Sequence, residues 1–346
     1  MRVVGYYPNW GTYARDFQVG DVHADQLTHL VYAFGKVTRG RCAPGDEWAD
    51  FGRNSGGNIG RLARLKAAHP GLKVMWSFGG WSGSDGFAEA ARDPARFADS
   101  CAALLNDRRW AGVFDGIDID WEYPNACGET CDHSGPRALG ALLAALRPKF
   151  PLVSAAVSGD AGKLGQADYA AAARSADWLN AMTYDFFGTG GTPGPTAAHS
   201  ALTAYPGIPN PGATADTTVR TLRGLGVPAS KILLGVGFYG RGWTGVRSAT
   251  PGTTGTGPAP GTHEKGLEDY RVLSRRCPPI GTLGGTALAV CGSEWWSYDT
   301  PETIRTKMAY ARSNALGGAF AWELSGDTKS ADLLHAMNAG LRPPAS

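Results

Sequence analysis

The stretch FDGIDIDWEYP, residues 114–124, places acidic residues at every second position. Asp118, Asp120 and Glu122 alternate with apolar residues, and side chains two positions apart on a β-strand share a face. Neighbouring carboxylates repel one another and resist burial, so a purely structural strand would not be expected to carry them at its C-terminal end. Asp115 lies at the entry to the strand, where a turn or capping role is expected. The stretch therefore predicts a strand with a chemical role.

Two kinds of chemistry use acidic side chains at this spacing. Asp and Glu oxygens bind Mg²⁺ or Ca²⁺, but neither a His nor a second acidic cluster lies within the stretch. In acid catalysis, mutual proximity raises the pKa of one carboxyl, which stays protonated near neutral pH and can protonate a leaving group. Glu122 is nearest the C-terminal end of the strand and is the predicted proton donor. No metal and no cofactor is predicted.

Seven further short runs of apolar, β-branched or aromatic residues accompany this strand along the chain. Stretches with helical spacing fall between them, for example at 61–69, 87–105, 138–150 and 167–176. This alternation is typical of parallel strands that are buried on both faces and covered by helices. The sequence therefore predicts an α/β protein, a (β/α)8 TIM barrel, with strands at 3–7, 27–34, 73–80, 116–122, 152–157, 178–185, 231–238 and 317–323.

The interval between the seventh and eighth predicted strands is too long for one helical crossover. It holds a helix-like segment at 266–276 and an aromatic end, WWSY at 295–298, that indicates strands. We expect residues 1–242 and 300–346 to form the barrel and residues 243–299 to form a small α+β insertion domain. An insertion after a barrel strand emerges at the C-terminal face, where active sites of this fold lie, so it is expected to form one wall of the substrate cleft.

Composition narrows the range of partners. The 346 residues carry a formal net charge of +2, with 33 basic and 31 acidic residues spread along the chain, so no nucleic acid and no membrane surface is expected as a partner. No apolar stretch reaches transmembrane length. Gly (49), Pro (22) and Trp (11) are abundant, a mixture that suits loops and aromatic surfaces that stack on sugars. We expect an uncharged partner and a monomeric chain.

The six cysteines lack the repeated Cys-x-x-Cys spacing of a zinc site. Their even number favours disulfides, and disulfides indicate an oxidising compartment. No signal peptide is visible at the start of the sequence, so a secreted, extracellular location is inferred from the cysteines and from the resemblance described next. Proximity in the sequence suggests one of fifteen possible connectivities, namely Cys127–Cys131 and Cys277–Cys291, which leaves Cys42 for Cys101.

FDGIDIDWEYP resembles the DxxDxDxE signature of family 18 chitinases, and it lies on the fourth predicted strand, as that signature requires. Further matches extend over nearly the whole chain: YAF (32–34), SFGG (77–80), MTYD (182–185), FYGRGW (238–243) and the Trp322 of AWE. The chain is similar to bacterial glycoside hydrolases of this family that carry an inserted domain between strands seven and eight.

The resemblance implies that the β-1,4 bonds between N-acetylglucosamine units of chitin and chitooligosaccharides are hydrolysed by a retaining, substrate-assisted mechanism. Glu122 would protonate the glycosidic oxygen while the N-acetyl carbonyl of the substrate attacks the anomeric carbon, giving an oxazolinium intermediate. Asp120 would orient the acetamido group, and Asp118 would share a proton or hydrogen bond with Asp120. Tyr184 would hydrogen-bond the attacking carbonyl oxygen, and Asp185 would support that site.

The same resemblance implies a pocket around the sugar. Trp322 would form its floor, Trp81 a stacking platform on the leaving-group side, and Arg241 a donor to a sugar hydroxyl or carbonyl. For Phe34 and Met182, ordinary packing in the barrel core is as strong an expectation as pocket lining. The remaining residues expected to line the pocket are Tyr7 and Tyr239.

Three residues on the third predicted strand have expected structural roles. Gly79 and Gly80 would permit close backbone approach, and Ser77 would be a hydrogen-bonding residue inside the barrel.

One competing motif, GVGFYG at 235–240, matches the G-x-G-x-x-G dinucleotide fingerprint. The segment after it is rich in Gly and has no helical period, so a dinucleotide site is disfavoured.

Two alternative functions stay open. One is an endo-N-acetylglucosaminidase that acts on N-glycan cores, and the other is a non-catalytic, lectin-like barrel that binds chitin. Non-catalytic relatives typically lack the terminal acid or its partners, whereas every acidic position of the motif is present here. FYGRGW followed by an insertion resembles chitinases with a deep, walled cleft, which favours a chitinase.

Overall fold

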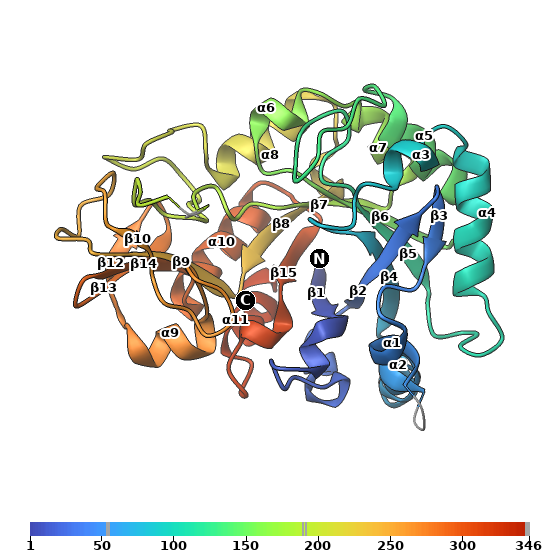
Figure 1. The fold of residues 1–346 in the computed structure, drawn as a ribbon, viewed down its shortest axis with the longest axis horizontal. Helices are drawn as coiled ribbons and strands as arrows, with labels where there is room; N and C mark the ends of the chain where they lie inside the picture. Colours follow the sequence, from blue (N-terminus) through green and yellow to red (C-terminus); the bar gives the residue numbers. More distant parts are fainter. Residues whose placement is uncertain (53–55, 189, 191, 343–346) are drawn as a thin grey trace.

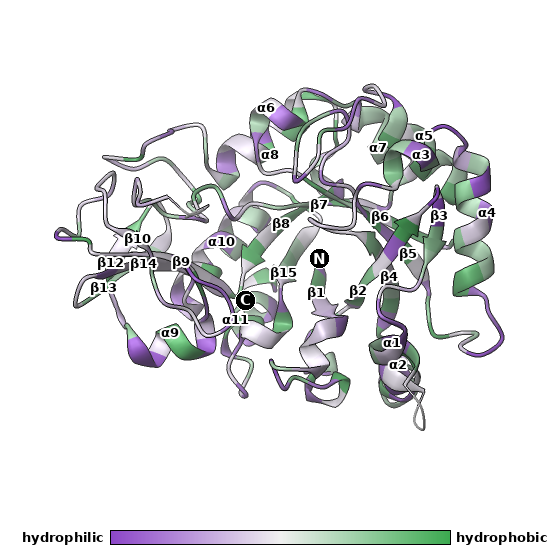
Figure 2. Ribbon diagram, in the orientation of Figure 1, coloured by the Kyte–Doolittle hydropathy of each residue, from purple (hydrophilic) through white to green (hydrophobic). Residues whose placement is uncertain are grey.

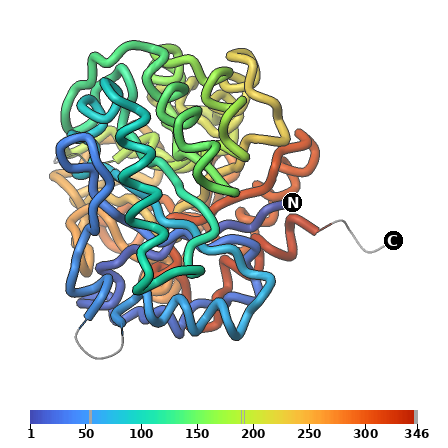
Figure 3. Tube along the Cα trace, turned by 90° about the vertical axis from the view of Figure 1, so that its right-hand side faces the viewer, coloured from blue at the N-terminus to red at the C-terminus, as the bar shows by residue number. Residues whose placement is uncertain are grey.

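Runs of β-branched and aromatic residues form parallel strands that close into a barrel, in a computed structural model that describes residues 1–52, 56–188, 190 and 192–342. The barrel strands are β1 (Arg2–Pro8), β2 (His29–Thr38), β4 (Lys73–Gly79), β5 (Gly116–Asp120), β6 (Leu152–Val157), β7 (Trp178–Ala181), β8 (Ile232–Gly237) and β15 (Gly318–Trp322). β1 pairs in parallel with both β2 and β15, so the first and last strands, blue and red in Figures 1 and 3, complete the ring.

Helices cover the outside of the barrel (Figure 1). At α4, Asp93 caps the N-terminus by accepting a backbone hydrogen bond, and Pro94 follows at the first helical position. Phe97, Cys101 and Leu105 recur at helical spacing on its buried face. The helices are α1 (Glu47–Phe51), α2 (Gly57–Ala68), α3 (Phe87–Ala90), α4 (Pro94–Leu105), α5 (Ala138–Leu146), α6 (Ala161–Leu164), α7 (Tyr169–Ser175), α8 (Ala215–Gly224), α9 (Tyr270–Arg276), α10 (Pro301–Ser313) and α11 (Asp332–Leu341).

Two apolar clusters lie on opposite faces of the barrel strands, which are largely green in Figure 2. The larger cluster fills the space between the strands and the surrounding helices. The smaller cluster lies inside the barrel and includes Tyr6, Trp178 and Phe320. Because successive side chains of a strand point to opposite faces, adjacent residues of one strand belong to different clusters.

A second, antiparallel sheet stands beside the barrel, orange in Figure 1. Its strands are β9 (Tyr239–Thr244), β10 (Gly257–Pro258), β11 (Leu267–Asp269), β12 (Pro279–Leu283), β13 (Thr286–Cys291) and β14 (Glu294–Tyr298). β9 already pairs with β11 at Tyr239, so the predicted boundary after residue 242 falls inside a strand of this sheet. The sheet begins directly after β8 because FYGRGW continues as an extended strand.

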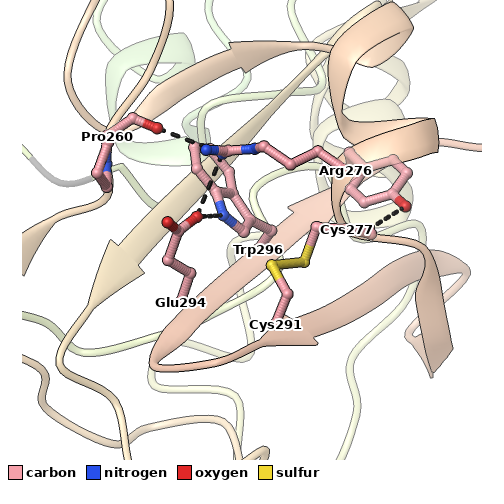
Figure 4. The surroundings of a disulfide bond; sticks show 7 residues. Pro260, Arg276, Cys277, Cys291, Glu294 and Trp296 are labelled. Carbon is pink, nitrogen blue, oxygen red and sulfur yellow. Dashed lines mark hydrogen bonds and ion pairs between the residues drawn. A yellow bond between two sulfur atoms is a disulfide. The ribbon is translucent and has the colours of Figure 1, made fainter.

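Three disulfides join the pairs that proximity in the sequence suggested, Cys42–Cys101, Cys127–Cys131 and Cys277–Cys291. The first connects α4 to β3 (Arg41–Ala43), a short strand paired with β2. The third connects the end of α9 to β13 (Figure 4). Beside it, Arg276 pairs with Glu294 at 3.2 Å, and the Trp296 indole donates to the same carboxylate at 2.7 Å.

The predicted α/β fold class and (β/α)8 barrel are confirmed, and each predicted strand overlaps an observed one. The predicted strand at 178–185 is too long, because β7 ends at Ala181 and the residues after it turn into the loop that forms the C-terminal face. Across the described parts of the chain, no helix combines the length and the apolar character needed to cross a membrane.

Candidate active site

The strand β5 carries the acids to the C-terminal end of the barrel. Asp118 and Asp120 are buried, while the isoleucines on either side of Asp118 belong to the outer cluster under the helices. Glu122 follows the strand, and its backbone N–H donates to Ser84 Oγ at 2.9 Å. Ser84 belongs to the loop after β4, so two neighbouring strands hold the position of Glu122. The alternation predicted from the sequence therefore brings the three acids together.

Asp118 is fully buried and surrounded by neutral donors. Its Oδ2 accepts hydrogen bonds from Tyr6 Oη at 2.9 Å and Ser77 Oγ at 2.7 Å. Its Oδ1 accepts from Ser154 Oγ at 2.5 Å and Asn180 Nδ2 at 3.4 Å. Burial raises the pKa of Asp118, although these hydrogen bonds favour the ionised form. The hydrogen bond predicted between Asp118 and Asp120 is therefore replaced, in this structure, by bonds to neutral donors.

Asp120 and Glu122 both have perturbed acidities. Asp120 is only 5% exposed, and its Oδ1 has no hydrogen-bond partner among the described residues. Burial, with the nearby Glu122 and Asp118, raises the pKa of Asp120 well above its ordinary value. Burial also raises the pKa of Glu122 to about 7, against the opposing effects of the neighbouring Tyr123 phenol and of Lys163. A carboxyl with this pKa keeps its proton in mildly acidic solution and can donate it.

Tyr184 and Asp185 lie just beyond β7, on the same side of the barrel as these acids. The Tyr184 ring packs edge-on against Tyr239, with ring centroids 6.3 Å apart. Burial, with the phenol of Tyr239 and nearby carboxylates, raises the pKa of Tyr184 well above its ordinary value, so its hydroxyl remains a donor. Asp185 has a positive φ of 56°, a backbone conformation that non-glycine residues rarely adopt. Its side chain points where Arg241 can reach it.

Arg241 comes from β9 of the second sheet and pairs with Asp185. Its Nε donates to Asp185 Oδ1 at 2.8 Å. Burial would raise the pKa of Asp185, but Arg241 and the neighbouring His199 outweigh it and hold that pKa well below its ordinary value. His199 is fully buried, with its ring 5.2 Å from that of Tyr239. The second sheet thus contributes Tyr239 and Arg241 directly to the surroundings of Asp185.

Aromatic rings gather around Trp322 at the end of β15. Phe34 stacks on Trp322 with centroids 5.5 Å apart, and Tyr6 meets it edge-on at 5.7 Å. Trp10 approaches Trp322 at 6.0 Å and remains 36% exposed. Met182 packs into the same inner cluster. Trp81, after β4, is 54% exposed, as expected of a side chain that is free to stack on a ligand.

One predicted pocket residue, Tyr7, lies elsewhere. Its ring belongs to the outer cluster, where it stacks on Tyr32 at 6.1 Å, and its hydroxyl donates to the Phe17 carbonyl at 2.8 Å. The neighbouring Tyr6 faces the barrel interior and donates to Asp118. The prediction for Tyr7 is therefore wrong. Successive side chains of β1 face opposite sides of the barrel wall, and it is Tyr6, not Tyr7, that faces the interior.

The residues with expected structural roles support the acids from below and beside. Asp115 Oδ2 accepts from the Val74 backbone N–H at 2.8 Å, at the entry to β5. Ser77 donates to Asp118 inside the barrel, as predicted. Gly79 has a φ of 112°, and a Cβ there would lie 2.1 Å from the Asp120 carbonyl oxygen. At Gly80 a Cβ would lie 2.7 Å from the Phe34 ring. Both glycines therefore permit the close approach that was expected.

Several residues of the site have no signature in the sequence motifs. Tyr6 and Asn180 were overlooked because they differ from core residues only in the side of the strand to which their side chains point. Trp10 follows β1 in a loop, where no periodicity points to the barrel axis. Lys163 comes from α6 and lies over the ring of Tyr123, a contact that no local pattern predicts. Within the described ranges, no three His, Cys, Asp or Glu side chains are arranged to hold a metal ion.

Protonatable acids beside exposed aromatic rings, at the C-terminal end of a barrel, are typical of enzymes that cleave glycosidic bonds. The comparison with known families agrees. The family model "Glycosyl hydrolases family 18" matches residues 2–327, and the chain belongs to this family. The predicted family is therefore confirmed.

Individual relatives extend this result. "Chitinase C" of Streptomyces lividans is 50% identical over 357 residues, which cover 95% of this chain and 58% of that protein. The catalytic domain of psychrophilic chitinase B from Arthrobacter TAD20 has a TM-score of 0.91 at 31% identity, over 99% of this chain and 95% of that one. A mutant of Ostrinia furnacalis Group II chitinase catalytic domain 2, in complex with penta-N-acetylchitooctaose, has a TM-score of 0.88 at 26% identity, over 99% and 98%.

Proposed function

We propose that this chain is a chitinase that hydrolyses the β-1,4 bonds between N-acetylglucosamine units, with Glu122 as general acid and base. The observation that carries the proposal is the arrangement at the C-terminal end of β5, where Glu122 follows the buried Asp118 and Asp120 and donates its backbone N–H to Ser84. Burial there raises the pKa of Glu122 to about 7. Such an acid can be protonated when substrate binds and ionised after it has given up its proton.

The proposed reaction has two steps and keeps the anomeric configuration. Glu122 gives its proton to the glycosidic oxygen as that bond breaks, and the acetamido carbonyl oxygen of the sugar bonds to the anomeric carbon, forming an oxazolinium ion. Water then attacks the same carbon and gives a proton to the Glu122 carboxylate. The bond between the anomeric carbon and the acetamido oxygen breaks, which opens the oxazolinium ring. The second step restores the acetamido group and the protonated acid. The substrate supplies the nucleophile in this scheme.

Asp120 and Tyr184 are proposed to hold the acetamido group. The unpartnered Asp120 Oδ1 can accept a hydrogen bond from the acetamido N–H and balance the positive charge of the intermediate. The Tyr184 hydroxyl, kept protonated by burial, can donate to the carbonyl oxygen. Asp118 and Asp185 support these two groups, and Trp322 is proposed as the apolar floor under the sugar ring, with Trp81 as a stacking platform.

Chitin and chitooligosaccharides are the proposed substrates. The relatives reported above are named chitinases, and the Ostrinia furnacalis domain is in complex with a chitooligosaccharide. The chain spans 58% of the length of the Streptomyces lividans protein, so the activity, substrates and partners of the whole protein belong to this proposal. The insertion, residues 243–299 together with the start of β9 at 239–242, is proposed as one wall of the substrate cleft.

Replacing Glu122 tests the proposal. Glu122→Gln keeps the shape of the side chain but cannot donate a proton, so we expect kcat to fall by about 10²- to 10⁴-fold. The assay uses chitooligosaccharides and their fully deacetylated counterparts, and only the acetylated substrate should be cleaved by the unchanged chain. Full activity in Glu122→Gln would refute the role of Glu122. Equal cleavage of deacetylated substrate would refute the substrate-assisted route.

The same assay separates the alternatives. Release of N-glycans without cleavage of chitooligosaccharides would indicate an endo-N-acetylglucosaminidase, and binding without cleavage would indicate a lectin.

A secreted location is also proposed, because three disulfides persist best in an oxidising compartment. The monomeric state stays a prediction that light scattering can test.

A further inference from the structure

The charges around Glu122 are unbalanced. Asp120 faces it from β5, and Asp185 faces it from the loop after β7. The negative charges of both carboxylates disfavour ionisation of Glu122. The phenols of Tyr123 and Tyr184 complete its titratable surroundings. Lys163 acts in the opposite direction and favours the ionised carboxylate. A single lysine therefore offsets part of the acidic field at this position.

Lys163 is held over the ring of Tyr123, the residue that follows Glu122. Its Nζ lies 4.1 Å from the ring centroid, a cation–π distance. The Lys163 side chain comes from α6, where its backbone N–H donates to Asp160 Oδ1 at 2.9 Å. Leu164 beside it is fully buried. These contacts fix the helical turn that carries the ammonium group.

A second connection joins the same two segments. Asn125 Nδ2, two residues beyond Tyr123, donates to the Gln166 carbonyl at 2.9 Å. The segment after β5 is thus joined at two points to α6 and the residues that follow it. Tyr123 directly follows Glu122 in the chain, and its phenol favours the ionised form of the Glu122 carboxyl. Lys163, Tyr123 and Glu122 therefore form a continuous chain of contacts from α6 to the proposed acid.

We propose that Lys163 is a positioning residue for the general acid: its ammonium group holds the Tyr123 ring in place next to Glu122, and it adds a positive charge near that carboxyl. This inference rests on the proposed function of Glu122. It assigns to α6 a role in the chemistry that no residue of the sequence motif supplies.

The proposal has a consequence for the pH profile. Both the positive charge of Lys163 and the neighbouring phenol of Tyr123 favour the ionised form of Glu122 and lower its pKa from the value that burial alone would give. Removing Lys163 raises that pKa, so Glu122 keeps its proton to higher pH. The basic limb of kcat/KM then moves upward. The carboxylate also becomes harder to regenerate, because it is the less favoured form.

The experiment compares Lys163→Met, Lys163→Arg and a control, Lys149→Met. Methionine keeps most of the stem without the charge, arginine keeps both the charge and the ring contact, and Lys149 belongs to a surface pair with Asp99. Profiles of kcat/KM on a chitooligosaccharide are measured from pH 4 to 9. In Lys163→Met the midpoint of the basic limb should rise by on the order of half a pH unit, while the other two variants keep the unchanged position.

Other outcomes overturn the inference. If Lys163→Met raises KM and leaves the basic limb in place, Lys163 binds substrate and does not act through Glu122. If Lys149→Met moves the limb equally, the effect belongs to net charge alone. Should Lys163→Met not fold, Tyr123→Phe provides a second arm, because loss of the hydroxyl must also move the limb upward. An inactive Glu122→Gln with an unmoved limb in Lys163→Met refutes this inference alone, whereas a fully active Glu122→Gln refutes the proposed function.

Discussion

Two adjacent tyrosines on β1 have different partners because a strand turns successive side chains to opposite sides. The Tyr6 hydroxyl donates to Asp118 at 2.9 Å and accepts from Asn180 Nδ2 at 2.9 Å, inside the barrel. The Tyr7 hydroxyl donates to the Phe17 carbonyl on the outside. Both side chains are almost fully buried, so burial alone does not distinguish a residue of the site from a residue of the core.

The pair provides a matched test. Tyr6→Phe removes one of the donors that hold Asp118 and one of the two acceptors of Asn180 Nδ2, so we expect kcat to fall by about tenfold, equivalent to about 1.4 kcal/mol of transition-state stabilisation. Tyr7→Phe should cost about 1 kcal/mol of unfolding free energy and leave kcat unchanged. Steady-state kinetics and urea unfolding measure the two effects. A larger loss of kcat in Tyr7→Phe would contradict the assignment of Tyr6.

At this scale, the motif predicted that the three acids lie together, but it did not predict the side chains from other elements that contact them. Asp118, Asp120 and Glu122 share one strand, so a period of two is enough to bring them together. Tyr6, Asn180 and Lys163 reach them from other elements, and their contacts depend on the barrel register. The sequence of one segment contains no information about that register.

Segments between elements join the second sheet to the barrel. Arg15, in the loop after β1, bridges Asp269 at the end of β11 and Glu323 directly after β15, with N–O distances of 2.8 and 2.9 Å. Both carboxylates are almost fully buried.

The barrel strands were predictable from the sequence because each is a continuous apolar run. The start of β9 was not predictable, because the chain passes from the barrel to the second sheet within a few residues and FYGRGW shows no break in its sequence pattern.

Removing Arg15 tests how much this bridge contributes. Arg15→Met leaves the buried Glu323 carboxylate without its ion-pair partner and leaves Asp269 paired with Arg271 alone, so we expect the free energy of unfolding to fall by about 3 kcal/mol. The control is Arg220→Met, which breaks the exposed pair with Asp216 and should cost less than about 1 kcal/mol. Chemical denaturation measures both losses. Equal losses in the two variants would contradict a structural role for the Arg15 bridge.

For the molecule as a whole, covalent links cross the fold at different ranges. Cys42 and Cys101 are 59 residues apart in sequence, Cys277 and Cys291 are 14 apart, and Cys127 and Cys131 are 4 apart. Proximity predicted the two short links because their partners lie in single loops or hairpins. The long link was assigned because only Cys42 and Cys101 were left. Its basis is tertiary, since β3 and α4 are distant in the sequence and pack together in the fold.

The lengths of these loops predict an order of stability. A crosslink removes conformational entropy from the unfolded chain, and it removes more when the closed loop is longer. Replacing both cysteines by serine should therefore lower the free energy of unfolding by about 4 kcal/mol for Cys42 and Cys101, about 3 kcal/mol for Cys277 and Cys291, and about 2 kcal/mol for Cys127 and Cys131. Urea unfolding of the three double variants measures the order. If the shortest link costs the most, local contacts of the loop after Glu122, and not chain entropy, determine what that disulfide contributes. In that case the same variant should also lose activity, because this loop follows the proposed acid.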